Sequence, residues 1–245
     1  MSPAPPSDRA VWLSGVHYAP SGGPRLLEDF EVSLSKGQVL ALVGRSGCGK
    51  STLLRVVAGL ARPASGAVHT EGRPAFVFQS PTLLPWRSLR RNVALPLELS
   101  GEHDEARVEA ALARVGLSEA AERLPHQLSG GMRMRASLAR ALVTRPGLLL
   151  MDEPFSAVDA LTRAHLHNEF SRLQAELGFS AVLVTHDIEE AVRLADVVKV
   201  LSGPPLKVES SFDVSFSRPR SPELVYEPGF VALVRALRQA MERVP

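Results

Sequence analysis

Nine consecutive residues, 44–52, have the composition of a phosphate-binding loop. Four of them match the spacing G-x-x-x-x-G-K-[ST]: Gly44, Gly49, Lys50 and Ser51. Glycines at these positions let the backbone wrap around phosphate oxygens with its N–H groups turned inward. The lysine neutralises charge on the β- and γ-phosphates, and the serine hydroxyl ligates Mg²⁺. The pattern therefore predicts a site for a nucleoside triphosphate and a magnesium ion.

The elements predicted on either side of this loop suit that chemistry. The apolar run at 39–43 is typical of a buried strand, and residues 51–60 have the pattern of a helix. A helix that begins at the loop adds free backbone N–H groups and a positive partial charge. The structural alternative is a glycine-rich turn that leads into a helix and binds nothing. On the phosphate-binding interpretation, the nucleotide contacts Gly44, Arg45, Ser46, Gly47, Cys48, Gly49, Lys50, Ser51 and Thr52.

A second group of chemically useful residues follows the apolar run 148–151. Asp152 and Glu153 come directly after it, at the C-terminal edge of a predicted strand, where open α/β sheets bind their ligands. Asp152 is expected to hold Mg²⁺ through a water molecule. Glu153 is placed to polarise a water molecule for in-line attack on the γ-phosphorus. The alternative is a pair of acidic residues that caps a strand before the turn at Pro154.

Two further polar residues, Gln79 and His186, stand at the ends of predicted strands. From its strand end, each side chain is expected to reach the γ-phosphate or the attacking water. We therefore predict three catalytic residues, Gln79, Glu153 and His186, and three metal-binding residues, Ser51, Gln79 and Asp152. The alternative for His186 is a structural role, and the other six histidines form no metal-binding pattern.

A second anion-binding nest is indicated by Ser129, Gly130 and Gly131, at the start of a helix predicted over residues 130–143. Two such nests in one chain are unusual for a kinase or a GTPase. The second makes sense if it closes over a nucleotide held by another copy of the chain. The simpler alternative is that Ser129 caps the helix and the glycines only lie nearby.

The remaining elements follow from hydrophobic periodicity and from the positions of glycine and proline. Further strands are predicted over residues 10–18, 26–34, 74–78, 180–184 and 197–201. Further helices are predicted over residues 107–116, 160–177, 188–194 and 229–244. The last helix is amphipathic and is expected to pack on its own domain, with partner binding as the alternative. The segments 20–24 and 63–72 are rich in turn-forming residues.

Strand patterns are missing between residues 80 and 145, where only helical patterns occur. The order is therefore α/β, then all-helical, then α/β again, which predicts a single domain over residues 1–245. Its predicted fold class is α/β, a P-loop NTPase core with a mixed, mainly parallel sheet and antiparallel N-terminal strands. Residues 1–78 and 146–245 form the nucleotide-binding core. Residues 79–145 form an inserted α-helical subdomain that carries the second nest.

The composition limits the classes of function. The chain has 245 residues and a net charge of +2, which is too little positive charge to indicate nucleic-acid binding. It contains no uninterrupted apolar stretch of about 18 residues, the length that a membrane-spanning helix needs. Residues 1–9 form a polar lead-in, expected to be disordered, without the apolar core of a signal peptide. The chain is therefore expected in the cytoplasm, with any membrane role exerted through a partner.

Together these motifs resemble the ATP-binding-cassette (ABC) ATPase family from about residue 12 to residue 203, and they occur in the family's order. By this resemblance, residues 44–52 are the Walker A loop and Gln79 is the Q-loop glutamine. Residues 148–152 are the Walker B strand, and Glu153 is the catalytic glutamate.

The resemblance extends to three further features. Residues 128–132 are similar to the signature sequence, with Met132 where the family usually has glutamine. Residues 156–159 are similar to the D-loop, with Val158 where leucine is commoner, and the last of them, Asp159, is assigned to nucleotide binding. His186 corresponds to the switch histidine. Tyr18 lies where the family places an aromatic ring that stacks on adenine.

The family resemblance also implies cofactors and partners. ATP and Mg²⁺ are the expected cofactors, with two ATP molecules between two copies of the chain in a head-to-tail dimer. The dimer is expected to bind an integral membrane permease, peripherally, at the cytoplasmic face of the inner membrane. A periplasmic or extracellular solute-binding protein would act with it indirectly. The groove near residues 79–91, with Leu83 and Trp86, is the expected docking surface for a permease helix.

Residues 78–87 resemble more narrowly the importers of nitrate, sulfonate, taurine and bicarbonate-type substrates, although Ser80 stands where an acidic residue is expected. Two alternatives remain. One is a soluble cassette ATPase that acts on ribosomes or DNA, but such proteins usually carry two cassettes or a long coiled coil. The other is a P-loop kinase, which would leave the signature sequence and His186 unexplained.

Overall fold

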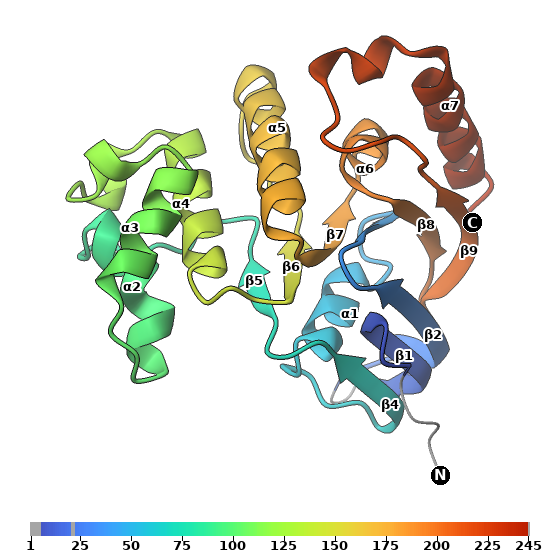
Figure 1. The fold of residues 1–245 in the computed structure, drawn as a ribbon. Helices are drawn as coiled ribbons and strands as arrows, with labels where there is room; N and C mark the ends of the chain where they lie inside the picture. Colours follow the sequence, from blue (N-terminus) through green and yellow to red (C-terminus); the bar gives the residue numbers. More distant parts are fainter. Residues whose placement is uncertain (1–5, 21–22, 245) are drawn as a thin grey trace.

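The computed structural model describes residues 6–20 and 23–244. Most of the predicted polar lead-in, residues 1–5, and two positions of the turn predicted at 20–24 lie outside the described residues. The described strands form a six-stranded sheet in the order β5-β6-β7-β3-β8-β9 and a three-stranded sheet in the order β2-β1-β4 (Figure 1). The predicted α/β fold class is confirmed.

The six-stranded sheet is parallel except at one edge. Its parallel strands are β3 (Val39–Gly44), β5 (Ala75–Val77), β6 (Leu148–Asp152), β7 (Ser180–Thr185) and β8 (Val197–Ser202). Every residue of β3 and β7 is buried, as expected of parallel strands that are covered on both faces. The antiparallel edge strand is β9 (Lys207–Asp213), which the sequence analysis missed. Its side chains alternate between exposed and half-buried, so the apolar signal is weak.

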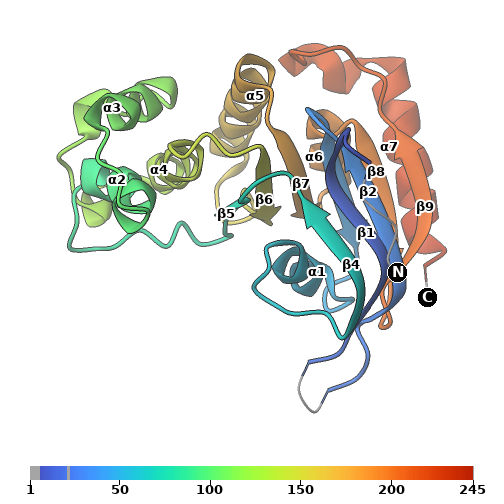
Figure 2. The ribbon, with the colours of Figure 1, turned by 60° about the horizontal axis from the view of Figure 1, so that its bottom comes forward.

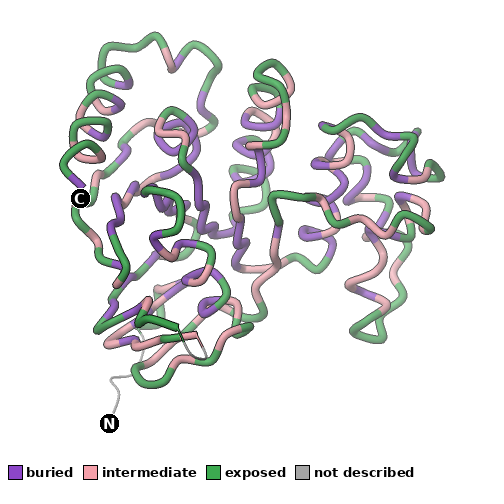
Figure 3. The backbone as a smooth tube through the Cα atoms, turned by 180° about the vertical axis from the view of Figure 1, so that it is seen from behind, coloured by how far each residue is buried: buried purple, intermediate pink, exposed green. Residues whose placement is uncertain are grey.

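Alternate residues of the sheet contribute to two separate cores. Leu40 and Leu42 of β3 pack with Leu53 of α1 (Lys50–Val57) and with the three-stranded sheet. Their neighbours Ala41 and Val43 pack on the opposite face of the sheet. That face is covered by the helices α5 (Ala160–Leu177), α6 (Ile188–Leu194) and α7 (Pro228–Glu242). The views from two directions show these layers, and Figure 3 shows that buried residues concentrate between them (Figures 1, 2 and 3).

The three-stranded sheet is antiparallel, as predicted for the N-terminal strands. It consists of β1 (Arg9–Tyr18), β2 (Leu27–Ser35) and β4 (Ser65–Thr70). Residues 63–72 are predicted to be rich in turns. This prediction is wrong for the residues that form β4. The misleading glycine, Gly66, has φ of +89°, and a Cβ there would lie 2.2 Å from the carbonyl oxygen of Gly15. Glycine is needed at this position because β4 approaches the backbone of β1 too closely for any side chain.

The helices α2 (Leu89–Leu99), α3 (Glu105–Arg114) and α4 (Gly130–Leu142) gather on one side of the molecule, beyond β5 (Figure 1). We call this group the helical subdomain. The bounds of α3 and α4 were predicted to within a few residues, but those of α2 were not, because Pro96 interrupts its helical pattern. One cluster of buried apolar side chains runs without a break from the sheet into this group.

Candidate functional site: a phosphate-binding loop with paired acidic residues

The phosphate-binding loop connects β3 to α1, as its sequence predicts. Gly49 precedes the first helical residue with φ of +115°, a conformation that strains any residue with a side chain. A Cβ on Gly44 would lie 2.7 Å from the carbonyl oxygen of Leu201 on β8. No side chain caps the start of α1, so its first N–H groups remain available to an anion. Both motif glycines are therefore required by the backbone geometry.

Lys50 is buried beneath its own loop, with 6% of its surface exposed. Its Nζ donates hydrogen bonds of 2.8 Å to the carbonyl oxygens of Gly44 and Arg45, and it lies 3.7 Å from Sγ of Cys48. These partners are uncharged, so the ammonium group keeps a positive charge that an anion on the loop can neutralise. Desolvation strengthens that attraction because the effective dielectric constant near a buried charge is low.

A hydroxyl and a carboxylate meet beside the loop. The Ser51 hydroxyl donates a hydrogen bond of 3.0 Å to Oδ1 of Asp152, which lies at the C-terminal end of β6. Burial raises the pKa of the Asp152 carboxyl, the Ser51 hydrogen bond opposes this, and the charge of Glu153 raises it further. A cation would relieve this unfavourable charge. The oxygen donors that Mg²⁺ prefers are thus present, and the residues fit a magnesium ion.

Glu153 and His186 form a second pair. Nδ1 of His186 lies 3.2 Å from Oε2 of Glu153, although one residue follows β6 and the other follows β7. Glu153 has φ of +45°, a strained value for a residue with a side chain. Its N–H donates to the carbonyl of Val184, and its own carbonyl accepts a 2.9 Å hydrogen bond from the Ser156 hydroxyl. Surrounding hydrogen bonds therefore hold the strained backbone in place.

Gln79 is linked to this pair through Ser156. Its Nε2 donates a hydrogen bond of 3.1 Å to the Ser156 hydroxyl, which in turn donates to the carbonyl of Glu153. Sequence reasoning included Ser156 in the D-loop stretch but gave it no role at the site. The one signal was its place three residues after Glu153, the spacing of a turn in which a serine hydroxyl bonds back to the backbone.

A cavity of about 230 Å³ opens over the loop. Among the described residues, it is lined by Leu26, Ser46, Gly47, Gly49, Lys50, Ser51, Thr52 and Glu153. Tyr18, which the family resemblance assigns to adenine, is half-buried at the end of β1, packs against the core and is not part of this lining. The cavity brings the loop and Glu153 together, and it contains no residue of the signature sequence.

The second nest caps a helix. The Ser129 hydroxyl accepts a hydrogen bond of 3.2 Å from the N–H of Met132 at the start of α4, as the simpler alternative stated. A Cβ on Gly131 would lie 2.5 Å from Cγ2 of Thr162, so glycine is needed where α4 meets α5. Ser129 and Gly130 nevertheless stay exposed. Capping therefore leaves this surface open to a second molecule.

Asp159 caps α5 in the same way. Its Oδ1 accepts a hydrogen bond of 3.0 Å from the N–H of Thr162, and this bond lowers the pKa of the Asp159 carboxyl. The side chain is exposed, and it is not part of the lining of the cavity over the phosphate-binding loop. Within this chain, the geometry gives Asp159 a helix-capping role.

An apolar groove of about 680 Å³ separates β5 from the helical subdomain. Phe76, Phe78, Leu95 and Leu99 contribute to its lining, and Leu99 is 80% exposed. Leu83, which was expected at this surface, is not part of the groove's lining; it is half-buried and packs against the apolar core. The groove is formed mainly by residues on both sides of the predicted segment 79–91.

The loop formed by residues 81–88 lies beside this groove and is held by polar side chains from two helices. Asn92 of α2 is fully buried; its Oδ1 accepts from the N–H of Leu84, and its Nδ2 lies 3.0–3.1 Å from the carbonyl oxygens of Leu84, Arg87 and Ser88. Arg140 of α4 donates to the carbonyls of Pro81 and Thr82 at 2.7 and 2.8 Å. Trp86 projects from this fixed loop with 73% of its surface exposed.

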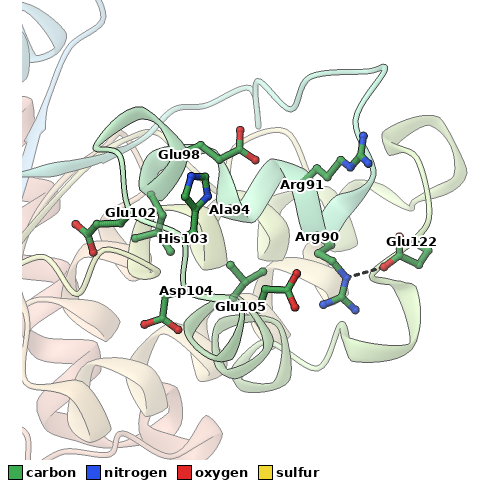
Figure 4. A pocket seen from close by; sticks show the side chains of 11 residues that line it. Arg90, Arg91, Ala94, Glu98, Glu102, His103, Asp104, Glu105 and Glu122 are labelled. Atoms are coloured by element: carbon green, nitrogen blue, oxygen red, sulfur yellow. Dashed lines mark hydrogen bonds and ion pairs between the residues drawn. The ribbon is translucent and has the colours of Figure 1, made fainter.

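A separate polar pocket of about 430 Å³ lies within the helical subdomain, near Arg90, His103 and Glu105 (Figure 4). Its charges are largely paired: Arg90 binds both Glu109 and Glu122. None of the site residues predicted from the sequence lines it. We therefore place the chemistry at the phosphate-binding loop and not here.

Comparison with known protein families gives an independent result. A model of the ABC transporter family matches residues 27–156. The nitrate import ATP-binding protein NrtC of Synechococcus elongatus is 45% identical over 217 residues, which cover 82% of this chain but 33% of NrtC. The aliphatic sulfonates import ATP-binding protein SsuB 1 of Xanthomonas axonopodis pv. citri is 44% identical, and the match covers 90% of this chain and 89% of SsuB 1. This chain thus spans about a third of NrtC and most of SsuB 1.

Solved structures give the same result. CbiO1 from Clostridium perfringens, part of the ABC transporter complex cbiONQ, superposes with a TM-score of 0.76 at 25% identity, covering 96% of this chain and 98% of CbiO1. The ATP-binding cassette MJ0796 was solved as a dimer in a post-hydrolysis state with ADP and Pi. It superposes with a TM-score of 0.71 at 27% identity, covering 84% of this chain and all of MJ0796. In the described part of this chain, no helix is both long and apolar enough to cross a membrane.

Proposed function

The chain belongs to the ABC transporter family, and from this premise we propose that it drives the import of a small oxyanion such as nitrate or an alkanesulfonate. It is an ATPase subunit of the importer type. The observation that carries the proposed mechanism is the Glu153–His186 pair, 3.2 Å apart, in which Glu153 lines the cavity over the phosphate-binding loop. The relatives NrtC and SsuB support the class of solute by their names.

The residues of this chain divide the work of hydrolysis. The loop N–H groups and Lys50 bind the phosphates, and Ser51, Asp152 and Gln79 would hold Mg²⁺, which neutralises charge on the phosphate oxygens. The Glu153 carboxylate accepts a proton from the attacking water, and His186 orients that carboxylate through its hydrogen bond. Gln79 fixes the backbone of Glu153 through Ser156.

We further propose that two copies bind ATP between them. Ser129 and Gly130 are exposed at the start of α4 and are not part of the lining of their own chain's loop cavity. A nucleotide on a second copy would be the natural ligand for this surface, and the cassette MJ0796 was solved as a dimer with ADP and Pi. ATP favours closure because its γ-phosphate would contact both chains, and hydrolysis removes that link.

The groove beside β5 is our proposed docking site for a permease helix at the cytoplasmic face of the membrane. Its phenylalanine and leucine side chains suit the apolar side of an amphipathic helix, and its arginines suit the polar side. Trp86 is exposed on the 81–88 loop, which reaches the groove at Thr82 and is held by Asn92 and Arg140. A preformed aromatic anchor costs little entropy on binding. A solute-binding protein would deliver the oxyanion to the permease from the opposite side.

The deciding experiment compares wild type with Glu153→Gln in the presence of Mg²⁺. We expect the variant to bind ATP, to lose steady hydrolysis by at least about 100-fold, and to double its mass by light scattering when ATP is added. The matched control is Glu189→Gln, which changes an exposed glutamate on α6 and should leave hydrolysis unchanged. Steady hydrolysis by Glu153→Gln would disprove the role of this carboxylate. A monomer at saturating ATP would contradict the two-copy site.

A further inference from the structure

Arg163, on the first turn of α5, joins two loops that meet at the site. Its Nη2 donates a hydrogen bond of 3.1 Å to the carbonyl of Val158, and its Nη1 lies 3.6 Å from Oδ2 of Asp187. The side chain is 31% exposed, and its Nε is buried without a partner among the described residues. The guanidinium thus spans from the turn after β6 to the turn after β7.

The two contacts of Arg163 flank the Glu153–His186 pair. Val158 belongs to the turn that begins with Ser156, whose hydroxyl and N–H both donate to the carbonyl of Glu153. Asp187 directly follows His186, and its Oδ1 caps α6 by accepting from the N–H of Glu190. The contacts form a ring, from Glu153 through the turn to Arg163, then through Asp187 and His186 back to Glu153.

We infer that Arg163 is a positioning residue for hydrolysis, which keeps the carboxylate of Glu153 and the imidazole of His186 at their bonding distance. The inference rests on the proposed function, since it assigns no separate activity. Glu153 has a strained backbone, and strained residues persist only where the surrounding structure holds them. Arg163 holds the turn after Glu153 through its hydrogen bond to the carbonyl of Val158. The same guanidinium contacts Asp187, the residue directly after His186.

Arginine suits this role better than lysine would. Its planar guanidinium presents several donors at fixed directions, so it can contact a carbonyl and a carboxylate at once. A lysine ammonium keeps the charge but is a single point on a flexible stem. Arg163→Lys should therefore retain the attraction to Asp187 and lose the fixed spacing between the two loops.

The alternative is that Arg163 only stabilises the packing of α5 against α6. The two roles differ in what they change. A packing role lowers the free energy of unfolding and leaves the kinetics of the folded protein intact. A positioning role lowers kcat and leaves the KM for ATP nearly constant, because the phosphate-binding loop is untouched.

The experiment measures steady-state ATP hydrolysis and ATP binding by the full chain with Mg²⁺. We expect Arg163→Ala to lower kcat by roughly 10- to 100-fold, as small displacements of catalytic groups do, with KM within about twofold of wild type. The kcat of Arg163→Lys should lie between those of Arg163→Ala and wild type. The matched control is Arg238→Ala, since Arg238 of α7 forms an exposed 2.9 Å ion pair with Glu189 of the same α6 helix. Its kcat should equal that of wild type.

Asp187→Asn provides a second, independent test that does not depend on the folding of Arg163→Ala. Asparagine keeps the cap on α6 but removes the charge that faces Arg163. We expect a several-fold loss of kcat, and in the double variant with Arg163→Ala a combined loss smaller than the product of the two. Full additivity, a kcat loss no larger than that of Arg238→Ala, or a proportional rise in KM would overturn the inference. A wild-type chain that does not hydrolyse ATP would instead contradict the proposed function.

Discussion

Two regions of the molecule are held in place in different ways. One is the edge of the six-stranded sheet with the phosphate-binding loop, and the other is the loop formed by residues 81–88. At the sheet edge, main-chain pairing fixes the strand ends: β7 pairs with β3 on one side and with β6 on the other, so β7 lies between Gly44 at the end of β3 and Asp152 at the end of β6. The 81–88 loop lies outside the described strands, and two polar side chains hold its carbonyls: Asn92 of α2, the helix that directly follows the loop, and Arg140 of α4. Main-chain hydrogen bonds thus position the site residues at the sheet edge, whereas the shape of the 81–88 loop depends on single side chains.

This difference predicts how each region fails when it is mutated. At the sheet edge, the backbone survives the loss of a side chain, so substitutions there should remove function and spare stability. In the 81–88 loop, the loss of the buried Asn92 amide leaves two backbone groups without their partner, the N–H of Leu84 and the carbonyl of Arg87, so stability should suffer first. The following four substitutions test this contrast, in order of decreasing expected effect.

Lys50→Met should have the largest effect. The substitution keeps the length of the buried side chain but removes the charge that faces the phosphates, so kcat/KM for ATP should fall by at least about 100-fold. Steady-state hydrolysis and nucleotide binding provide the measurement. Lys36→Met is the control, because Lys36 is half-exposed and pairs with Glu71 away from the site. Comparable activity of the two variants would contradict the assignment of Lys50.

Asn92→Ala should lower the free energy of unfolding by about 2 kcal/mol, because it leaves the N–H of Leu84 and the carbonyl of Arg87 without their hydrogen-bond partner. Denaturant-induced unfolding measures this change. Arg91→Ala, an exposed neighbour on α2, should stay within about 0.5 kcal/mol of wild type. If the two variants are equally stable, the 81–88 loop is held by something other than the Asn92 side chain.

Trp86→Ala should weaken binding of the copurified permease by about tenfold, as the loss of an interface tryptophan does. Its free energy of unfolding should be unchanged within about 0.5 kcal/mol, because the side chain is 73% exposed. A pull-down titration with the permease in detergent gives the affinity. Leu60→Ala removes another exposed apolar side chain, 69% exposed beyond α1, and should leave the affinity unaltered.

Asp152→Asn should have the smallest effect. Unlike Asn92→Ala, it should raise the free energy of unfolding. Burial raises the pKa of the Asp152 carboxyl in the folded chain, so its ionised form opposes folding at pH 7. Without nucleotide or Mg²⁺, the variant should be more stable by less than about 1 kcal/mol, since partial exposure screens the charge. The gain should vanish as the pH falls below about 4, where the unfolded carboxyl is protonated too. Thermal melts at pH 7 and pH 4 test this, and a less stable variant at pH 7 would contradict it.

Where a segment's structure follows from neighbouring residues, it was predicted well. The strands β3, β6 and β7 are continuous apolar runs, and the glycine at 178 ends α5 where the pattern stops. The misses are positions where contacts across the chain override local signals. Gly66 lies in the segment 63–72, which is predicted to be rich in turns, but the close approach of β4 to β1 requires glycine there. The docking role expected for Leu83 stays a prediction, since the side chain is half-buried and packs against the core.

The candidate site divides in the same way. Five site residues were predicted because each stands at a strand end or in a short motif whose spacing determines where the side chain points: Gln79, Ser51, Asp152, Glu153 and His186. Ser156 and Arg163 were not, because nothing in their own neighbourhood shows which carbonyl or carboxylate they will meet. Tyr18 and Asp159 were assigned through the family resemblance, and their contacts in this chain are with the core and with a helix start.

The sequence by itself determined which chemical groups stand together: a glycine-rich loop with a lysine and a serine hydroxyl, and two carboxylates at the end of a strand. These depend on residues within a few positions of one another, where the backbone allows few arrangements. Only the tertiary structure decided which distant side chains meet, including Glu153 with His186, Arg163 with Asp187, and Arg140 with the 81–88 loop. Those contacts depend on how strands and helices pack, which no local pattern of residues specifies.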